Sequence, residues 1–231
     1  MLFAPCLLIY LLICLAFLGL LFLLIQIEVI RAAFVVLGLS PTAALFVLLL
    51  SLIGSYVNIP LYTVESGPPA PTTTVDNFGV TYSVPSAYSS PGTTTVAINV
   101  GGAVIPLLIA AYALLSTPAA ILPSILGTAV VALVTHRTAR LMPGVGITLP
   151  LFVPPLAAAF VAILLARVMR TRRSTLLIAY VSGVVGTLIG ADLSNLHAIT
   201  HLGAPVASIG GMGTYDGVFL TGIVAVLLAG F

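Results

Sequence analysis

Two aspartates in the C-terminal third of the chain stand where a charged side chain is least expected. Asp192 and Asp216 are the only acidic residues after Asp76, and each lies in an apolar, glycine-rich stretch. A carboxylate inside a membrane span is unfavourable and usually marks a functional site. Two carboxylates about 3–5 Å apart in a low-dielectric site share one proton, so one acts as a base on water and the other as an acid toward a carbonyl group. This chemistry is typical of peptide hydrolysis that needs neither a cofactor nor a metal ion.

The same carboxylates leave other interpretations open. A glycine-rich break beside a carboxylate resembles the discontinuous helices of secondary transporters, in which Asp192 and Asp216 would bind a proton or a small cation. Alternatively, both residues cap helices, with Asp216 starting a helix at Gly217, and the chain is a membrane scaffold without chemistry. A metal site formed by Asp192 with His197 and His201 would lack the glutamate of zinc-protease motifs. An enzyme, a transporter and a scaffold all remain candidates.

The composition indicates a membrane protein. Apolar residues make up 61% of the 231 residues and charged residues 5%, whereas a soluble domain has about 25% charged residues. The lipid bilayer is therefore the predicted partner. No nucleotide fingerprint or basic nucleic-acid patch is present, so a nucleic-acid partner is not expected.

Apolar runs and helix-breaking prolines predict seven membrane spans. The first, Leu2 to Ile27, has no basic segment before it and is too long for a signal peptide, so we interpret it as a retained helix. Glu28 and Arg31 follow it at a spacing that allows an ion pair. The other spans are predicted at residues 41–56, 104–115, 119–134, 151–168, 174–192 and 217–231. The predicted fold class is an all-α, polytopic transmembrane helical bundle, with residues 1–231 forming a single membrane domain.

Glycines on the sixth predicted span indicate close helix packing. Gly183, Gly186 and Gly190 recur at spacings of three and four residues, which forms a small-residue face on a helix. We predict that this face packs against the seventh span within the chain. A dimer interface is the alternative, and the sequence leaves the oligomeric state open.

One substantial polar segment interrupts the spans. Residues 62–98, between the second and third spans, are rich in Pro, Thr, Ser and Tyr and are predicted to form an extracytoplasmic loop or a small cap. Within it, the alternation of Val80 to Val84 is compatible with a hairpin.

The arginines predict the orientation in the membrane. With seven spans, Arg137 and Arg140 lie on one side of the bilayer, and five arginines lie on the other: Arg31, Arg167, Arg170, Arg172 and Arg173. The side with more basic residues is usually cytoplasmic. We therefore expect a multi-pass protein of the cell membrane with its N-terminus outside and its C-terminus in the cytoplasm.

Helix lengths place the two aspartates at a similar depth. Counted from the side with five arginines, Asp192 lies about 27 Å and Asp216 about 22 Å along its helix. Polar and glycine-rich motifs after the second span and before the third and fifth are expected at the same level. Irregular backbone at membrane depth is buried in protein or lines a wet cavity. We predict an outward-facing polar cavity lined by Asn58, Asn99, Gly101, Gly102, Gly210, Gly211, Gly213, Tyr215 and Gly217.

These motifs carry a resemblance to a known family. Gly190-Ala-Asp-Leu193, Ser208-Ile-Gly-Gly-Met-Gly-Thr-Tyr-Asp-Gly217 and Phe219-Leu-Thr-Gly222, with the Asn-Ile-Pro-Leu and Asn-Val-Gly-Gly elements, look like a prokaryotic integral-membrane family known as a domain of unknown function. The resemblance covers most of the chain outside residues 62–95. It implies a membrane fold found in archaea and bacteria and implies no activity. Tyr215 stands where the family is expected to have Phe.

A second resemblance concerns chemistry alone. Presenilin-like and signal-peptide-peptidase-like proteases carry one Asp after Tyr and another in Gly-x-Gly-Asp, on two successive membrane helices. Here Gly-Ala-Asp192 comes first and Tyr-Asp216 second, so the order is reversed. The analogy implies an intramembrane aspartyl protease that cleaves a transmembrane peptide.

Overall fold

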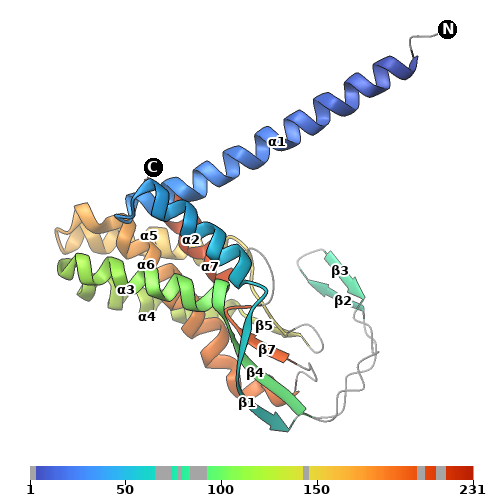
Figure 1. The fold of residues 1–231 in the computed structure, drawn as a ribbon. Coiled ribbons are helices and arrows are strands. Elements are labelled where there is room, and N and C mark those ends of the chain that lie inside the picture. Colours follow the sequence, from blue (N-terminus) through green and yellow to red (C-terminus); the bar gives the residue numbers. More distant parts are fainter. Residues whose placement is uncertain are drawn as a thin grey trace. The chain divides into compact units, whose positions relative to one another are not determined.

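The computed structural model describes residues 4–65, 74–77, 80–83, 93–142, 146–201, 206–211 and 217–230. Most of these residues are helical, and short strands connect the helices (Figure 1). The chain divides into two compact units, Met1–Leu48 and Leu49–Phe231.

The first unit contains a long helix that only lipid can solvate. The helix α1 (Ala4–Val36) extends past the predicted end of the first span, and Arg31 pairs with Glu28 at 2.5 Å, as their spacing predicts. Apolar side chains from Leu12 to Ile25 are exposed on all sides. The next helix, α2 (Pro41–Gly54), starts at the predicted position because the Ser40 hydroxyl accepts a hydrogen bond from the backbone N–H of Ala43 at 3.2 Å.

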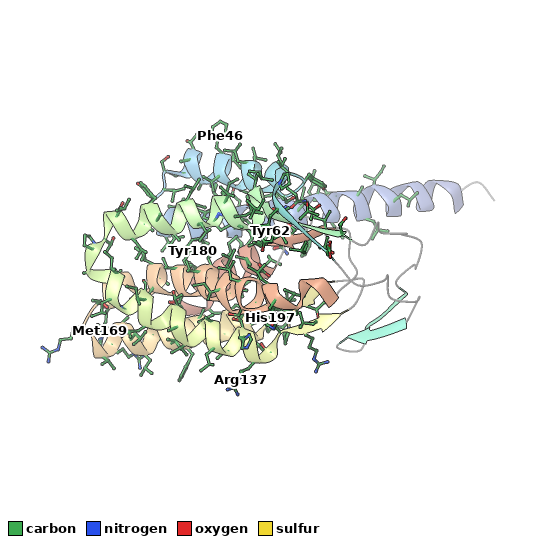
Figure 2. All side chains as sticks on the ribbon, turned by 90° about the horizontal axis from the view of Figure 1, so that it is seen from below. Phe46, Tyr62, Arg137, Met169, Tyr180 and His197 are labelled. Atoms are coloured by element: carbon green, nitrogen blue, oxygen red, sulfur yellow. The ribbon has the colours of Figure 1, made fainter. Side chains whose placement is uncertain are left out.

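The second unit is a helical bundle arranged around one buried helix. Its helices are α3 (Ile105–Ser116), α4 (Ile121–Thr138), α5 (Val153–Val168), α6 (Thr175–Thr187) and α7 (Gly217–Gly230). Helix α6 packs against the other four, and every residue from Leu177 to Val184 is buried. Figure 2 shows Tyr180 of α6 within the bundle. The surrounding helices instead expose large apolar side chains, such as Leu115 at 81% and Phe160 at 68%. A helix that is apolar on all sides is a core helix, and an apolar exterior requires lipid.

Glycines set the helix directions within this bundle. Gly127 of α4 lies against Ser182 of α6, and Gly186 lies against Val131, so α4 and α6 run parallel. Gly183 lies against Thr221 of α7, and Gly230 lies near Leu176, so α6 and α7 run antiparallel. The end of α6 and the start of α7 therefore lie at the same end of the bundle.

The predicted glycine face contacts three helices instead of one, because Gly183 also lies against Ala158 of α5. Gly183 packs against α7, as expected, but Gly186 and Gly190 pack against α4. The prediction that all three face the seventh span was wrong for two of them. All three glycines lie in close contact with other helices of the bundle.

The second unit also contains strands, which an all-α fold class does not include. Strand β4 (Thr93–Asn99) pairs antiparallel with β1 (Asn58–Glu65) and parallel with β7 (Val206–Ile209), giving the order β1-β4-β7. Strands β2 (Thr74–Asn77) and β3 (Val80–Ser83) form a hairpin, as do β5 (Arg140–Met142) and β6 (Gly146–Thr148). The Thr-rich run before Asn99 suits a half-buried strand once partners are available, and composition alone did not reveal those partners.

Among the described residues, three helices are long and apolar enough to cross a membrane: Leu12–Val36, Pro118–Thr138 and Thr175–Ala198. Four other apolar helices are shorter: Pro41–Gly54, Val100–Ser116, Val153–Val168 and Gly217–Gly230. The chain is therefore associated with membranes, and the count of seven spans stays a prediction. The second predicted span is shorter than expected, because α2 ends at Gly54 and Asn58 begins a strand.

Packing at Gly186 gives a testable prediction. A Cβ atom there would lie 2.7 Å from Val131 Cβ and 3.1 Å from the carbonyl oxygen of Thr128. We expect Gly186→Ala to destabilise the protein by about 1–3 kcal/mol through overpacking. The measurement is thermal unfolding in detergent.

Gly19 provides the matched control, because a Cβ atom there meets nothing within 4 Å. Gly19→Ala should be neutral or stabilise α1 by up to about 1 kcal/mol. Equal losses of stability in the two variants would contradict the close packing of α4 on α6.

Candidate functional site

A polar network joins the three strands of the β1-β4-β7 sheet. Asn58 begins β1, Asn99 ends β4 and Ser208 lies on β7. The Asn58 Oδ1 atom accepts hydrogen bonds from Asn99 Nδ2 at 3.1 Å and from the Ser208 hydroxyl at 2.6 Å. These contacts connect three segments that are far apart in the sequence.

Asn99 is buried and has three hydrogen-bond partners. Its Nδ2 atom also donates to the carbonyl oxygen of Ser55 at 2.8 Å, and its Oδ1 atom accepts from the Gly102 N–H at 2.7 Å. The second bond caps the π-helical turn Val100–Val104, which leads directly into α3. One amide side chain thus fixes the change from strand to helix.

The two glycines of that turn are required by close backbone contacts. A Cβ atom on Gly101 would collide with the backbone of Ser51 and Ser55, and one on Gly102 would collide with the carbonyl oxygen of Gly210. The Ser51 hydroxyl also donates to the Gly101 carbonyl oxygen at 2.6 Å. Side chains at Gly101 or Gly102 would therefore separate the sheet, α2 and the turn after β7.

Asp192 binds the turn that follows β7. Its Oδ2 atom accepts a hydrogen bond from the Gly210 N–H at 2.7 Å. Gly210 and Gly211 have φ angles of +83° and +80°, a conformation that suits glycine. A carboxylate held by a backbone N–H forms a strong hydrogen bond in a partly buried site. The carboxylate therefore connects the end of α6 to the segment that leads to Asp216.

A π-helical turn at the end of α6 determines where this carboxylate points. Residues Leu188–Asp192 form the turn, and the Leu193 N–H bonds to the carbonyl oxygen of Leu188. A π-helical turn contains one residue more than an α-helical turn, and that extra residue rotates the later side chains by about 100°. In an uninterrupted α-helix, Asp192 would lie on the same helix face as Val185. Val185 is the one residue between Leu177 and Leu188 that is not buried. The turn directs the carboxylate toward the protein interior.

The carbonyl groups at this helix end are occupied by nearby side chains. The Ser194 hydroxyl donates to the Ile189 carbonyl oxygen at 2.8 Å, and Asn195 Nδ2 donates to those of Gly190 at 3.3 Å and Ala191 at 2.7 Å. Asn195 is itself buried. These bonds stabilise the break in the helix and leave the three carbonyl groups less available to a cation.

The structure brings together six of the predicted site residues: Asn58, Asn99, Gly101, Gly102, Asp192 and Gly210, with Gly211 adjacent. Gly217 is the first residue of α7. Gly213, Tyr215 and Asp216 lie outside the described residues. Three further polar residues of the site were not predicted from the sequence: Ser55, Ser208 and Asn195. Ser208 and Asn195 are polar residues close to the two glycine-rich motifs, which is the signal that would have identified them.

The alternative of a metal site receives no support from the described residues. Among them, no group of three His, Cys, Asp or Glu side chains is placed to hold a metal ion. His197 is exposed on the 3-10 helix Leu193–His201, and the side chain of His201 lies outside the described set.

Comparison with known families extends the resemblance seen in the sequence. A family model described as "Protein of unknown function (DUF1614)" matches residues 52–228. The chain belongs to this family. The DUF1614 match includes the whole polar network, Asp192, Gly210 and Asp216, and it excludes α1. The chain matches no curated protein and no solved structure.

The different hydrogen-bonding roles of two asparagines in the DUF1614 region give a prediction. Asn99 donates through Nδ2, whereas Asn58 accepts through Oδ1. Asn99→Asp removes the two hydrogen bonds that Nδ2 donates and places a negative charge beside the Ser55 carbonyl oxygen and Asn58 Oδ1. We therefore expect the free energy of unfolding to fall by about 3 kcal/mol or more. Asn58→Asp keeps the accepting oxygen and should cost less. Chemical denaturation in detergent measures both, and a larger loss for Asn58→Asp would contradict this network.

Proposed function

We propose that Asp192 and Asp216 form the carboxylate pair of an intramembrane aspartyl protease whose substrate is a transmembrane peptide. The observation that carries this proposal is the Asp192–Gly210 hydrogen bond. It ties one carboxylate to the segment that ends, six residues later, at the other.

The packing of α6 and α7 supports the pairing. The two helices are antiparallel neighbours, α6 leads into the turn that ends at Asp192, and α7 begins directly after Asp216. The end of α6 and the start of α7, which directly follows Asp216 in the sequence, therefore lie at the same end of one helix pair. The inward rotation of Asp192 also favours a role in the protein interior over one at the lipid surface.

The proposed reaction is the addition of water to a peptide bond. The water oxygen attacks the carbonyl carbon while the ionised carboxylate takes a proton from the water and the protonated carboxyl gives its proton to the carbonyl oxygen. The resulting diol collapses as the amide nitrogen is protonated and the C–N bond breaks, releasing a carboxylic acid and an amine. The reaction requires no cofactor.

A second candidate, proton-coupled transport, is favoured by the break in α6. A carboxylate at a helix discontinuity is typical of secondary transporters. A metal cation there would need several oxygen ligands, and the Ser194 and Asn195 side chains already occupy three nearby carbonyl groups. A proton is therefore the better-supported coupling ion.

We propose that the end of the bundle that carries Asp192 faces outside. Because α4 and α6 are parallel, Asp192 belongs to the same end as Arg137. Arg167 lies in the last turn of α5, and the arginines from Arg170 to Arg173 lie between α5 and α6. Figure 2 shows Met169, next to those arginines, at the opposite end of the bundle from His197. The larger group of arginines favours the cytoplasm for that opposite end. The polar segment 62–98 would then be an extracytoplasmic cap.

Removing one charge at a time tests the role of the aspartates. Asp192→Asn and Asp216→Asn should each reduce activity by at least about 100-fold, because an amide cannot exchange the shared proton. In Asp192→Asn the amide oxygen can still accept the Gly210 N–H, so the protein should stay folded. Glu65→Gln is the matched control, because Glu65 is an exposed carboxylate at the end of β1. Full activity in either Asp variant would leave only the helix-capping role.

The assay format separates the two functions. A protease should cleave a helix-destabilised transmembrane peptide in detergent micelles without a gradient. A proton-coupled transporter should move solute only in sealed vesicles with a proton gradient. Activity in neither format with wild-type protein would favour the scaffold.

Labelling tests the orientation independently. A cysteine placed between Thr72 and Pro91, with Cys6 and Cys14 replaced by Ser, should react with a membrane-impermeant thiol reagent added to intact cells. A cysteine at Arg172 should react only after the cells are opened. The reverse pattern would place the Asp192 end of the bundle in the cytoplasm.

A further inference from the structure

Thr187 on α6 carries a buried hydroxyl that has no hydrogen-bond partner among the described residues. The residue is 0% exposed. Threonines elsewhere in these helices bond to the carbonyl oxygen four residues earlier, as Thr135 does to Val131 and Thr221 to Gly217. An unpaired buried hydroxyl destabilises a fold by about 1–3 kcal/mol. Thr187 therefore needs a partner that the described part of the chain does not supply.

The position of Thr187 places it between Asp192 and α7. Gly183, one turn earlier on the same face, would direct a Cβ atom to 3.3 Å from Thr221 of α7. Because the helices are antiparallel, the turn of α6 that contains Thr187 lies beside the first turn of α7, which begins at Gly217. This face therefore leads from the packed middle of the α6–α7 contact toward Asp192 and the first turn of α7.

The π-helical turn aligns Thr187 with Asp192. Residues five apart across a π-helical turn lie one above the other, as residues four apart do in an α-helix. Thr187 immediately precedes the turn and Asp192 ends it. In an uninterrupted α-helix, the two side chains would be about 140° apart. The inserted residue thus brings a hydroxyl and a carboxylate onto one face.

We propose that the Thr187 hydroxyl binds a water molecule between α6 and the first turn of α7, and that this water is hydrogen-bonded to the Asp192 carboxyl. The site deepens the proposed proteolysis, on which its functional meaning rests, by supplying a fixed water beside a reacting carboxylate. A hydroxyl can donate and accept at once, and a buried water commonly makes about three hydrogen bonds. Thr187 is therefore a positioning residue.

A different buried hydroxyl on the same helix provides the control. Ser182 also has no hydrogen-bond partner among the described residues, but its hydroxyl lies against Gly127 of α4, on another face of α6. It is ten residues from Asp192, about 15 Å along a helix. A general effect of removing a buried hydroxyl should appear in Ser182→Ala, whereas an effect on the Asp192 site should not.

Infrared spectroscopy tests the water site without an activity assay. At acidic pH, the C=O stretching band of protonated Asp192 is identified by its loss in Asp192→Asn. Thr187→Val keeps the side-chain shape and removes the hydroxyl, so the band should move to higher frequency as a hydrogen bond to the carboxyl is lost. Thr187→Ser should restore the wild-type frequency, and Ser182→Ala should not change it. An unchanged band in Thr187→Val would overturn the inference.

Turnover links the site to the proposed function. Thr187→Val should lower kcat for peptide cleavage by roughly 10- to 100-fold with little change in KM, because the water is misplaced and substrate binding is not. Ser182→Ala should cleave at the wild-type rate. If Asp192→Asn retains activity while Thr187→Val still shifts the band, proteolysis fails and the water site stands. A shifted band with unchanged turnover in Thr187→Val would show that Thr187 does not position the reacting water.

Discussion

Burial of α6 on all sides is the constraint on which the rest of the second unit depends. A helix surrounded by other helices has no solvent to satisfy its polar groups, so every break must be satisfied within the protein. At the end of α6, the Ser194 and Asn195 side chains donate hydrogen bonds to backbone carbonyl oxygens of the irregular turn. The Thr135 hydroxyl of α4 donates to the Gly186 carbonyl oxygen at 3.2 Å. The break can therefore persist, and it provides the position from which Asp192 reaches Gly210.

Close backbone contacts also link the end of α6 to the sheet. The Gly210 N–H donates a hydrogen bond to Asp192, and the Gly210 carbonyl oxygen lies close to Gly102. The Gly102 N–H in turn donates to Asn99 Oδ1. Larger side chains at either glycine would separate α6 from the sheet. The motifs near residues 58, 99, 192 and 210 thus act as one unit, although long stretches of chain separate them. All of these motifs lie within the single family match over residues 52–228.

The sequence was most informative where local chemistry is strong. Helix-breaking prolines predicted the start of α2 and the division between α3 and α4, and the Glu28–Arg31 spacing predicted an ion pair. The sheet was not predicted, because its parallel β4–β7 pairing joins residues more than a hundred positions apart and strand preference depends on such partners. The π-helical turn was also missed, since one inserted residue leaves no signal in an apolar helix. The prediction that the Asn58 and Asn99 motifs lie on the same face of the membrane as Asp192 came from the order of the spans and did not require the sheet.

The two irregular turns explain why a capping role alone accounts poorly for Asp192. A cap needs only an acceptor near a helix end, which Ser or Asn provides at least as well in a membrane as a carboxylate. The turn at Leu188–Asp192 instead rotates the carboxylate away from the side of Val185 and aligns it with a buried hydroxyl. A second π-helical turn, Val100–Val104, supports the glycine that Gly210 contacts. Such turns are less regular than an α-helix and often occur at functional sites. One of these turns ends at Asp192 and the other contacts Gly210, to which Asp192 is bonded, so both irregular turns meet at this carboxylate.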